Sequence, residues 1–186
     1  MPRRAAPINP SPNQAAKDLN ARILNISTVR ELCVLIDDRV AVFDYIHVPT
    51  AFRQVLGLPL RGTPRGVVEQ ALEKLERRAV HICDSLGGRG LATILHALAR
   101  HRRSPSNTHL LPALEGRLRV VAGQCDPQAI SNTLWAYATL GERPGAGVVQ
   151  ALEARLRVVV GDCSSQAISN TLWAYASLGE LSLIHI

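Results

Sequence analysis

The chain has 186 residues, of which 47% are hydrophobic and only 4% aromatic, and its formal net charge is +6. This composition excludes a wholly disordered chain, and its many Ala and Leu residues favour packed helices over a β-sandwich. No apolar run approaches the roughly 20 residues that span a bilayer, so we expect no membrane segment. The basic balance favours a polyanionic partner such as nucleic acid, although a basic protein without such a partner also fits this modest charge.

The amino terminus differs from the rest of the chain. It is basic and rich in proline, and no acidic residue precedes Asp18. Organelle transit peptides share this bias, but the prolines disfavour an amphipathic helix. We therefore predict that residues 1–14 are a flexible basic tail or the remnant of a targeting segment. A helical-repeat domain is predicted over residues 15–180.

The first helices of this domain have weak sequence signals. Residues 15–43 carry two helical segments, and Ser27 is the predicted N-cap of the second, Thr28–Phe43. A divergent helix is expected over 50–56. The next helix is predicted over Val67–Ile82, because its apolar residues recur at helical spacing.

Later helices have clear start and stop signals. Asp126 followed by proline is a typical helix start, and Gly141 is expected to end that helix at Leu140. A second helix is predicted over Gly147–Val160. Ser164 then supplies the cap of another helix, at the position that corresponds to Asp126.

A near-verbatim repeat determines the expected architecture. Gln128–Glu142 returns as Gln166–Glu180, at an offset of 38 residues and with a single Thr-to-Ser difference. The segment between the copies repeats as well, since Leu114–Cys125 returns as Leu152–Cys163. A fixed period of roughly 20–50 residues is typical of solenoids, in which each unit buries its apolar face against its neighbours. The sequence therefore predicts an all-α fold, an α-solenoid of antiparallel helix pairs with a period of about 38 residues.

The last residues break this period. Leu181–Ile186 stands where a loop and a second helix should follow Glu180, and it matches what a common transposon-end adapter encodes. We interpret these six residues as an adapter or cloning scar. The helical domain is accordingly expected to be truncated, with the natural protein continuing beyond it.

A helical wheel of 128–140 leaves one polar stripe outside its apolar circumference. In the two near-identical copies the stripe consists of Gln128, Ser131, Asn132, Trp135 and Thr139, and of Gln166, Ser169, Asn170, Trp173 and Ser177. The earlier helix at 91–99 aligns with these copies, and its stripe consists of Arg89, Thr93, His96 and Arg100. Arg53 takes the corresponding tryptophan position in the first unit. We expect the stripe to line the concave surface of the solenoid.

The stripe carries amide, hydroxyl, aromatic and guanidinium groups. Such groups hydrogen-bond to base edges, stack on bases and hold phosphates, so these residues are the candidate RNA-binding set. A structural role is the alternative. Asn132 and Asn170 would then bond to neighbouring backbone groups, and the two tryptophans would pack between adjacent units.

Basic residues outside the stripe are the second signal. Arg102, Arg103, Arg119 and Arg157 are candidate phosphate contacts, each of which would add salt-dependent affinity. Arg119 and Arg157 each follow a glutamate by four residues, so intrahelical ion pairs are the alternative.

The repeat sequence resembles a known family. The run Ala129–Gly141, followed by Ala151–Leu156, resembles the octotricopeptide repeat, a 38-residue unit with an Asn-Thr-Leu-Trp-Ala core. Residues 19–52 are similar to the helical repeats of FAST-kinase-like proteins and of the mitochondrial RNA-editing substrate-binding complex. The resemblance implies an organellar RNA-binding solenoid, in a mitochondrion or plastid, that acts in mRNA processing, editing, stability or translation. Other subunits of an RNA-processing complex are the further partners that it implies.

No enzyme motif accompanies the repeat. The sequence has no Ser/His/Asp constellation, no paired carboxylates, no phosphate-binding loop and no metal-ligand spacing, so we expect neither catalysis nor a cofactor. Cys33, Cys83, Cys125 and Cys163 form no CxxC pair and are expected to be reduced structural thiols. Single-stranded RNA is the expected partner. A protein-interaction scaffold of the HEAT or TPR type is the alternative function.

Overall fold

The structure is a computed structural model that describes residues 12–179. The predicted adapter segment and most of the predicted basic tail lie outside the described residues. Within 12–179 the chain is all-α and contains no strand. Its helices are α1 (Pro12–Asn25), α2 (Val29–Arg39), α3 (His47–Gly57), α4 (Arg65–His81), α5 (Gly88–Arg100), α6 (Leu110–Val121), α7 (Pro127–Leu140), α8 (Ala146–Val159) and α9 (Ser165–Leu178).

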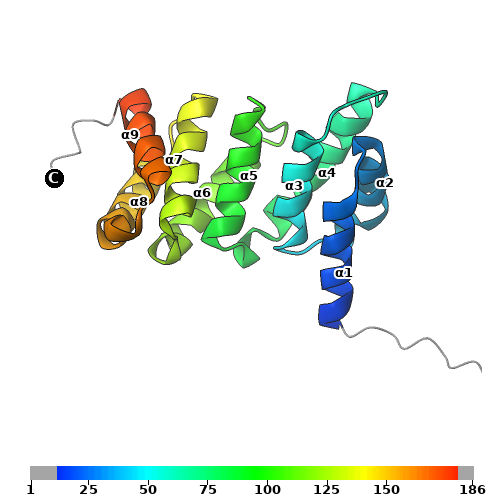
Figure 1. Cartoon of the computed structure of the whole chain (residues 1–186), viewed down its shortest axis with the longest axis horizontal. Coiled ribbons are helices and arrows are strands. Elements are labelled where there is room, and N and C mark those ends of the chain that lie inside the picture. Colours follow the sequence, from blue (N-terminus) through cyan, green and yellow to red (C-terminus); the bar gives the residue numbers. More distant parts are fainter. Residues whose placement is uncertain (1–11, 180–186) are drawn as a thin grey trace, which may run out of the picture.

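The helices form two layers (Figure 1). In one layer α1, α3, α5, α7 and α9 pack side by side in chain order, and in the other α2, α4, α6 and α8 do the same. Short 3₁₀ turns end α2, α4, α6 and α8 and lead the chain back to the odd-numbered layer. The odd-numbered layer is the one that carries the predicted polar stripe.

The core lies between the layers and between neighbouring helices. Leu95 on α5 and Leu134 on α7 are fully buried, as are Leu72 on α4 and Leu118 on α6. Each of these leucines belongs to the apolar face of its own helix, and the hydrophobic effect drives that face onto the neighbouring helices. Tyr137 is also fully buried. Burial raises the pKa of its hydroxyl, and the Glu115 carboxylate raises it further.

The predicted signals at the ends of α7 and α9 are confirmed. The Asp126 side chain accepts a hydrogen bond from the Ala129 N–H at 2.7 Å, and the Ser164 hydroxyl accepts one from the Ala167 N–H at 3.2 Å. Gly141 ends α7 at φ +71°, in the left-handed region that favours glycine.

The prediction for α2 was wrong at both ends. Thr28, and not Ser27, is the N-cap, because its hydroxyl accepts a hydrogen bond from the Glu31 N–H. The helix stops at Arg39, and the 3₁₀ turn Val40–Val42 follows instead of a continued helix to Phe43. Ser and Thr both serve as N-caps, so sequence alone does not choose between adjacent candidates. The start of the helical domain also differs from the prediction, because α1 begins at Pro12 and not at residue 15.

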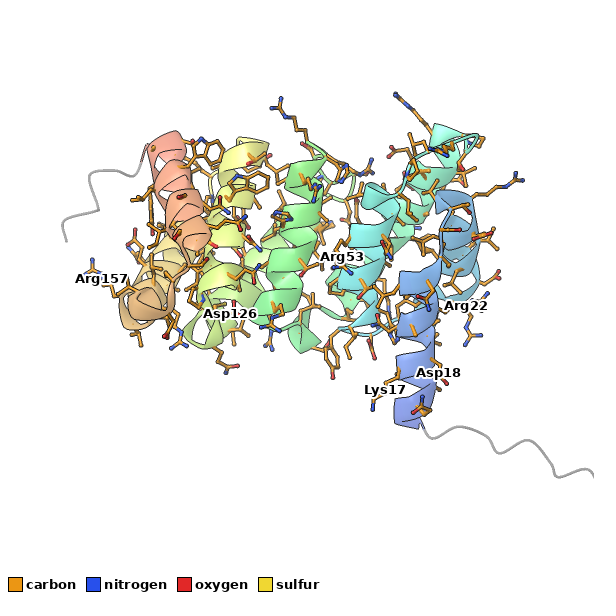
Figure 2. The ribbon with its side chains drawn as sticks, viewed as in Figure 1. Lys17, Asp18, Arg22, Arg53, Asp126 and Arg157 are labelled. Atoms are coloured by element: carbon orange, nitrogen blue, oxygen red, sulfur yellow. The ribbon has the colours of Figure 1, made fainter. Side chains whose placement is uncertain are left out.

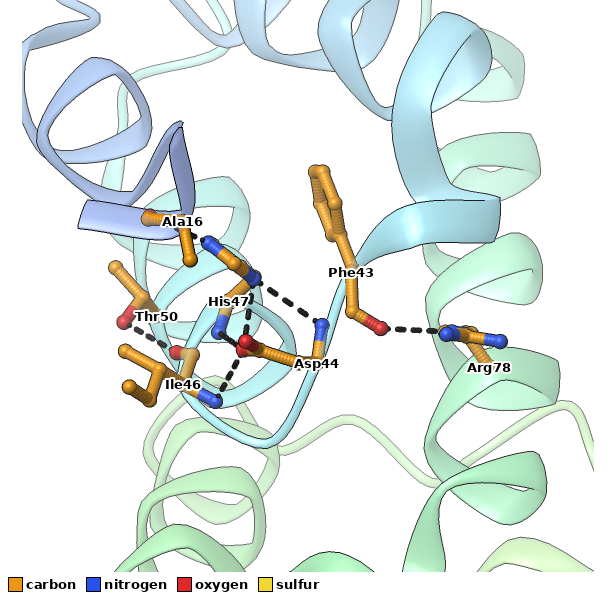
Figure 3. Close-up of polar contacts among 7 residues, drawn as sticks. All are labelled: Ala16, Phe43, Asp44, Ile46, His47, Thr50 and Arg78. Carbon is orange, nitrogen blue, oxygen red and sulfur yellow. Dashed lines mark hydrogen bonds and ion pairs between the residues drawn. The ribbon is translucent and has the colours of Figure 1, made fainter. Parts of the chain in front are cut away.

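Buried polar contacts join α1 to α3 (Figure 3). The imidazole of His47 is buried, and its Nε2 lies 2.9 Å from the Ala16 carbonyl oxygen. The Asp44 carboxylate accepts hydrogen bonds from the backbone N–H groups of Ile46 and His47. These contacts fix where the first helix of the odd-numbered layer sits.

Three even-numbered helices, α4, α6 and α8, each use an arginine to bond a backbone carbonyl. The carbonyl lies just before the odd-numbered helix with which the even-numbered helix is paired. Arg78 donates to the Phe43 carbonyl at 2.8 Å, as Figure 3 shows, while Arg117 donates to Leu86 and Arg155 to Cys125, both at 2.9 Å. Each carbonyl comes directly after a 3₁₀ turn. The bond therefore ties together the two helices of the pairs α3/α4, α5/α6 and α7/α8.

Candidate nucleic-acid interface

Acidic residues are concentrated in one of the two layers. Helices α3, α5, α7 and α9 contain no Asp or Glu. Every even-numbered helix contains at least one, and these acids are Glu31, Asp37, Asp38, Glu69, Glu73, Glu76, Glu115 and Glu153. The predicted stripe residues Arg53, Arg89 and Arg100 are all exposed in the acid-free helices. The even-numbered helices also carry most of the Lys and Arg residues, so the odd-numbered layer is distinguished by the lack of carboxylates on α3, α5, α7 and α9 and not by a much higher net charge.

Three of the predicted residues form an aromatic row across α5, α7 and α9. The ring centroids of His96 and Trp135 are 5.1 Å apart, and those of Trp135 and Trp173 are 6.3 Å apart. Both pairs are tilted, at 36° and 37°, and lie within the range of attractive aromatic contacts. The row brings together positions 39 and 38 residues apart in the sequence.

The row limits where a base can stack. A base inserted between two parallel rings needs about 7 Å, which is twice the stacking repeat of about 3.4 Å. The Trp135 ring has neighbours on both sides at shorter centroid distances and at a tilt, so it has no room for an inserted base. Trp173 ends the row and is 47% exposed. Its ring is therefore the one that is open to stacking.

The surroundings of the His96 ring favour its neutral form. Burial lowers the pKa of His96, and the nearby Arg100 guanidinium lowers it further. A neutral imidazole packs against Trp135 and offers one donor and one acceptor, but it does not act as a phosphate-binding cation.

An amide-lined groove of about 290 Å³ separates the first turns of α7 and α9. Gln128 and Gln166 are exposed at its rim, and Asn132 and Asn170 are half-buried in its wall. None of these four side chains bonds to another residue within 12–179. The predicted alternative, in which the asparagines bond to neighbouring backbone groups, is therefore not what the described part of the chain contains.

A second groove, of about 370 Å³, separates α3 from α5 and has a different character. It is lined by Arg53, Arg89 and Thr93 from the predicted set. Tyr45 and Thr50 also line it, and sequence reasoning missed both. Tyr45 precedes α3 in an irregular segment, where no helical periodicity could identify it. The groove combines guanidinium, hydroxyl and aromatic groups.

Arg89 also links α5 to the start of α7. It donates a hydrogen bond to the Asp126 carboxylate at 2.8 Å. Burial opposes ionisation of Asp126, yet the bonds from Arg89 and from the Ala129 backbone lower its pKa below the usual value. Figure 2 shows Arg53 on α3 and Asp126 at the start of α7, both in the odd-numbered layer. Asp126 and Asp162, which both line the α7–α9 groove, thus place negative charge at the edge of a layer whose helices α7 and α9 are themselves free of acids.

The predicted hydroxyls divide between the core and the surface. Ser131 was wrongly expected in the exposed stripe, because it is buried and its hydroxyl donates to the Gln128 carbonyl at 3.1 Å. The corresponding Ser169 and the nearby Ser177 on α9 are exposed, while Thr139 on α7 is half-buried. The difference follows from coverage, since α7 has helices on both sides and α9 has only α7 beside it in the described residues.

The predicted phosphate contacts also divide. Arg103 is only 15% exposed and pairs with Glu69 and, at 3.7 Å, with the buried Glu76, so it neutralises a core carboxylate and is not free for phosphate. Arg102, Arg119 and Arg157 are exposed. No ion pair within 12–179 joins Arg119 or Arg157 to the glutamate four residues before it. These two lie in the even-numbered layer, apart from the stripe.

Within 12–179 no cluster of three or more His, Cys, Asp or Glu side chains is arranged to hold a metal ion. The four cysteines are free thiols, and three of them are buried. None of the described helices combines the length and apolarity needed to cross a bilayer. No protein-family model matches the chain, and no curated protein is significantly similar to it.

Proposed function

We propose that this chain is an α-solenoid whose helix pairs repeat about every 38 residues, and that its odd-numbered layer binds single-stranded RNA. One observation carries the proposal: four successive helices of one layer contain no acidic residue, while the helices behind them hold eight. The same layer exposes the guanidinium, amide and aromatic groups that hold phosphates and bases.

The two grooves differ in chemistry, and each suits a different part of the RNA. The α3–α5 groove carries Arg53, whose guanidinium group has no ion-pair partner within 12–179 and suits the phosphate oxygens of the backbone, and Arg89, which is largely exposed but also pairs with Asp126. The α7–α9 groove carries amides, which both donate to and accept from base edges, and its lining also includes the carboxylates of Asp126 and Asp162, which accept hydrogen bonds from base amino groups and repel phosphate. Trp173 beside this groove offers a ring for stacking. The RNA would thus be anchored by charge at α3–α5 and contacted through its bases at α7–α9.

Single strands fit this chemistry better than duplexes. Bases in a duplex are stacked and paired, and the deep major groove of duplex RNA hides their edges. An aromatic ring and amide groups on an exposed helical layer need unpaired bases. The resemblance to organellar repeat proteins is the ground for locating this role in a mitochondrion or plastid, in mRNA processing, editing, stability or translation.

The direct test is binding of a fluorescent single-stranded RNA, followed by anisotropy between 50 and 200 mM salt. Three phosphate contacts give a slope of about −2 in log K against log salt, or roughly a 20-fold loss of affinity over this range. Arg53→Ala should reduce the slope by about 0.7, which is one phosphate contact on a single strand.

Arg157→Ala is the matched control, because Arg157 is an exposed arginine of the other layer. It should leave the slope unchanged. An equal effect of both variants would point to unspecific attraction by the net charge. Absence of RNA binding at 50 mM salt would favour the protein-interaction scaffold.

A further inference from the structure

The outer face of α9 is apolar, and no residue within 12–179 covers it. Ile168 and Leu172 are 45% and 49% exposed, and Trp173 adds a half-exposed ring. Val160, in the 3₁₀ turn before α9, is exposed as well. No residue of α9 carries a charged side chain, so covering this face requires no desolvation of an ion.

The same sequence is covered one unit earlier. Ile130 and Leu134 on α7 correspond to Ile168 and Leu172, and both are 0% exposed. α7 has α5 and α9 beside it in its own layer and contacts α8 across the layers. α9 has only α7 beside it in the described residues. The protein itself therefore shows what kind of element buries this surface.

A backbone group next to α9 agrees with this reading. The carbonyls of Phe43, Leu86 and Cys125 each receive a hydrogen bond from an arginine of the following even-numbered helix. Cys163 also follows a 3₁₀ turn and is the next in this series. No side chain within 12–179 donates to its carbonyl. A helix placed like α8 would bring its arginine to this oxygen.

We propose that the outer face of α9 is a docking surface for a further helix pair of the α8/α9 kind. Its first helix would supply an arginine to the Cys163 carbonyl, and the pair together would cover Ile168 and Leu172. Continuity with the α5–α7–α9 packing identifies this occupant, because the docked pair extends an interface that the molecule already makes twice. The proposal concerns protein association and does not rest on RNA binding, but a docked pair would cover Trp173 and so exclude the stacking of a base on that ring.

The test extends the chain by one copy of residues 142–179, joined directly after Gly179. Trp135→Phe is included so that Trp173 is the only reporter, with the unextended Trp135→Phe chain as reference. Docking should shield the Trp173 ring, with an emission shift to shorter wavelength and an acrylamide quenching constant at least two-fold lower. Leu172→Ala should lower the thermal midpoint of the extended chain by several degrees more than that of the unextended chain.

The matched control replaces, in the appended copy, the arginine that corresponds to Arg155 by alanine. It should leave Trp173 shielded and lower the thermal midpoint, because only the bond to the Cys163 carbonyl is lost. An extension that adds helix by circular dichroism but leaves Trp173 quenching unchanged would overturn the proposal.

A dimer of the unextended chain would also overturn the proposal. If sedimentation gives a dimer that Ile168→Asp converts to a monomer, the occupant is a second copy of the chain. The Val120→Asp variant, at an exposed valine of α6, serves as the control for unspecific effects of the new charge.

Discussion

Helices α7 and α9 have the same sequence over most of their length and different surroundings. In α7 the Ile-Ser-Asn-Thr-Leu-Trp segment has neighbours on both sides, and Ile130, Ser131 and Leu134 are buried. In α9 the same segment exposes Ile168, Ser169 and Leu172. Only the residues that face the core, such as Tyr137 and Tyr175, are buried in both helices. The comparison shows that the exposure of these side chains depends on the neighbouring helices and not on the local sequence.

This difference decides which residues are available to a ligand. The sequence predicts the same exposed residues in both helices, because the stripe is derived from a single helical wheel. In the fold only α9 offers its serine and a freely accessible tryptophan, whereas α7 contributes its amides at the groove. We therefore expect the same substitution to have different effects in α7 and in α9, and matched substitutions in the two helices test this.

The largest expected difference is in stability. Leu134→Ala should lower the free energy of unfolding by about 3 kcal/mol, because it leaves a cavity in a fully covered site. Leu172→Ala removes a half-exposed side chain and should cost about 1 kcal/mol or less. Urea unfolding of both variants, followed by circular dichroism, measures the two values. Equal costs would mean that α9 is covered in solution.

Next is the contribution of the tryptophans to RNA affinity. Trp173→Ala should weaken single-stranded RNA binding by about 2 kcal/mol, or roughly 30-fold, because base stacking on an aromatic ring contributes about 1–3 kcal/mol. Trp135→Ala should reduce stability more than Trp173→Ala does, since its ring packs against the core and between two other rings. Anisotropy and urea unfolding of the two variants separate these effects. The opposite ranking would contradict the assignment of Trp173 as the open ring.

The amides should affect binding without affecting folding. Asn132→Ala and Asn170→Ala should each weaken RNA binding by about 1 kcal/mol, the value of a hydrogen bond to a base edge. Stability should stay unchanged or rise by a few tenths of a kcal/mol, because alanine is the better helix former and neither amide has a partner within 12–179. A loss of stability in either variant would assign that asparagine a structural role.

The smallest effect concerns the two helix caps, of which only Asp126 titrates. Its pKa is lowered in the folded state, so its contribution to stability is complete above the unfolded value of about 3.9. That contribution is lost as the pH falls through the lower folded value. Because the side chain is 38% exposed and screened by solvent, the change should be below about 1 kcal/mol.

Asp126→Ser copies the cap of α9 and should reduce the loss of stability between pH 6 and pH 3. Comparing the urea midpoints of the variant and the parent at both pH values isolates the contribution of the Asp126 carboxylate to stability. An identical pH dependence would show that Asp126 does not contribute through its charge.

Local signals predicted much of the fold and less of the site. The caps Asp126 and Ser164 and the stop at Gly141 follow from short-range hydrogen bonding and backbone geometry, which a sequence states directly. Ser131 could not be placed, because its burial depends on a helix that lies 34 residues or more away in the chain. Arg103 was misjudged for the same reason, since its partners Glu69 and Glu76 belong to another helix. The concentration of acidic residues in one layer became visible only when the layers were known.

The most direct test of the proposed interface is ultraviolet crosslinking of single-stranded RNA to the intact chain, with the crosslinked residues mapped by mass spectrometry. We predict crosslinks at Trp173 and at exposed stripe residues of α3, α5 and α9, with competition by unlabelled single strands. Crosslinks confined to α4, α6 and α8, or none at 50 mM salt, would contradict the assignment of the odd-numbered layer as an RNA-binding surface.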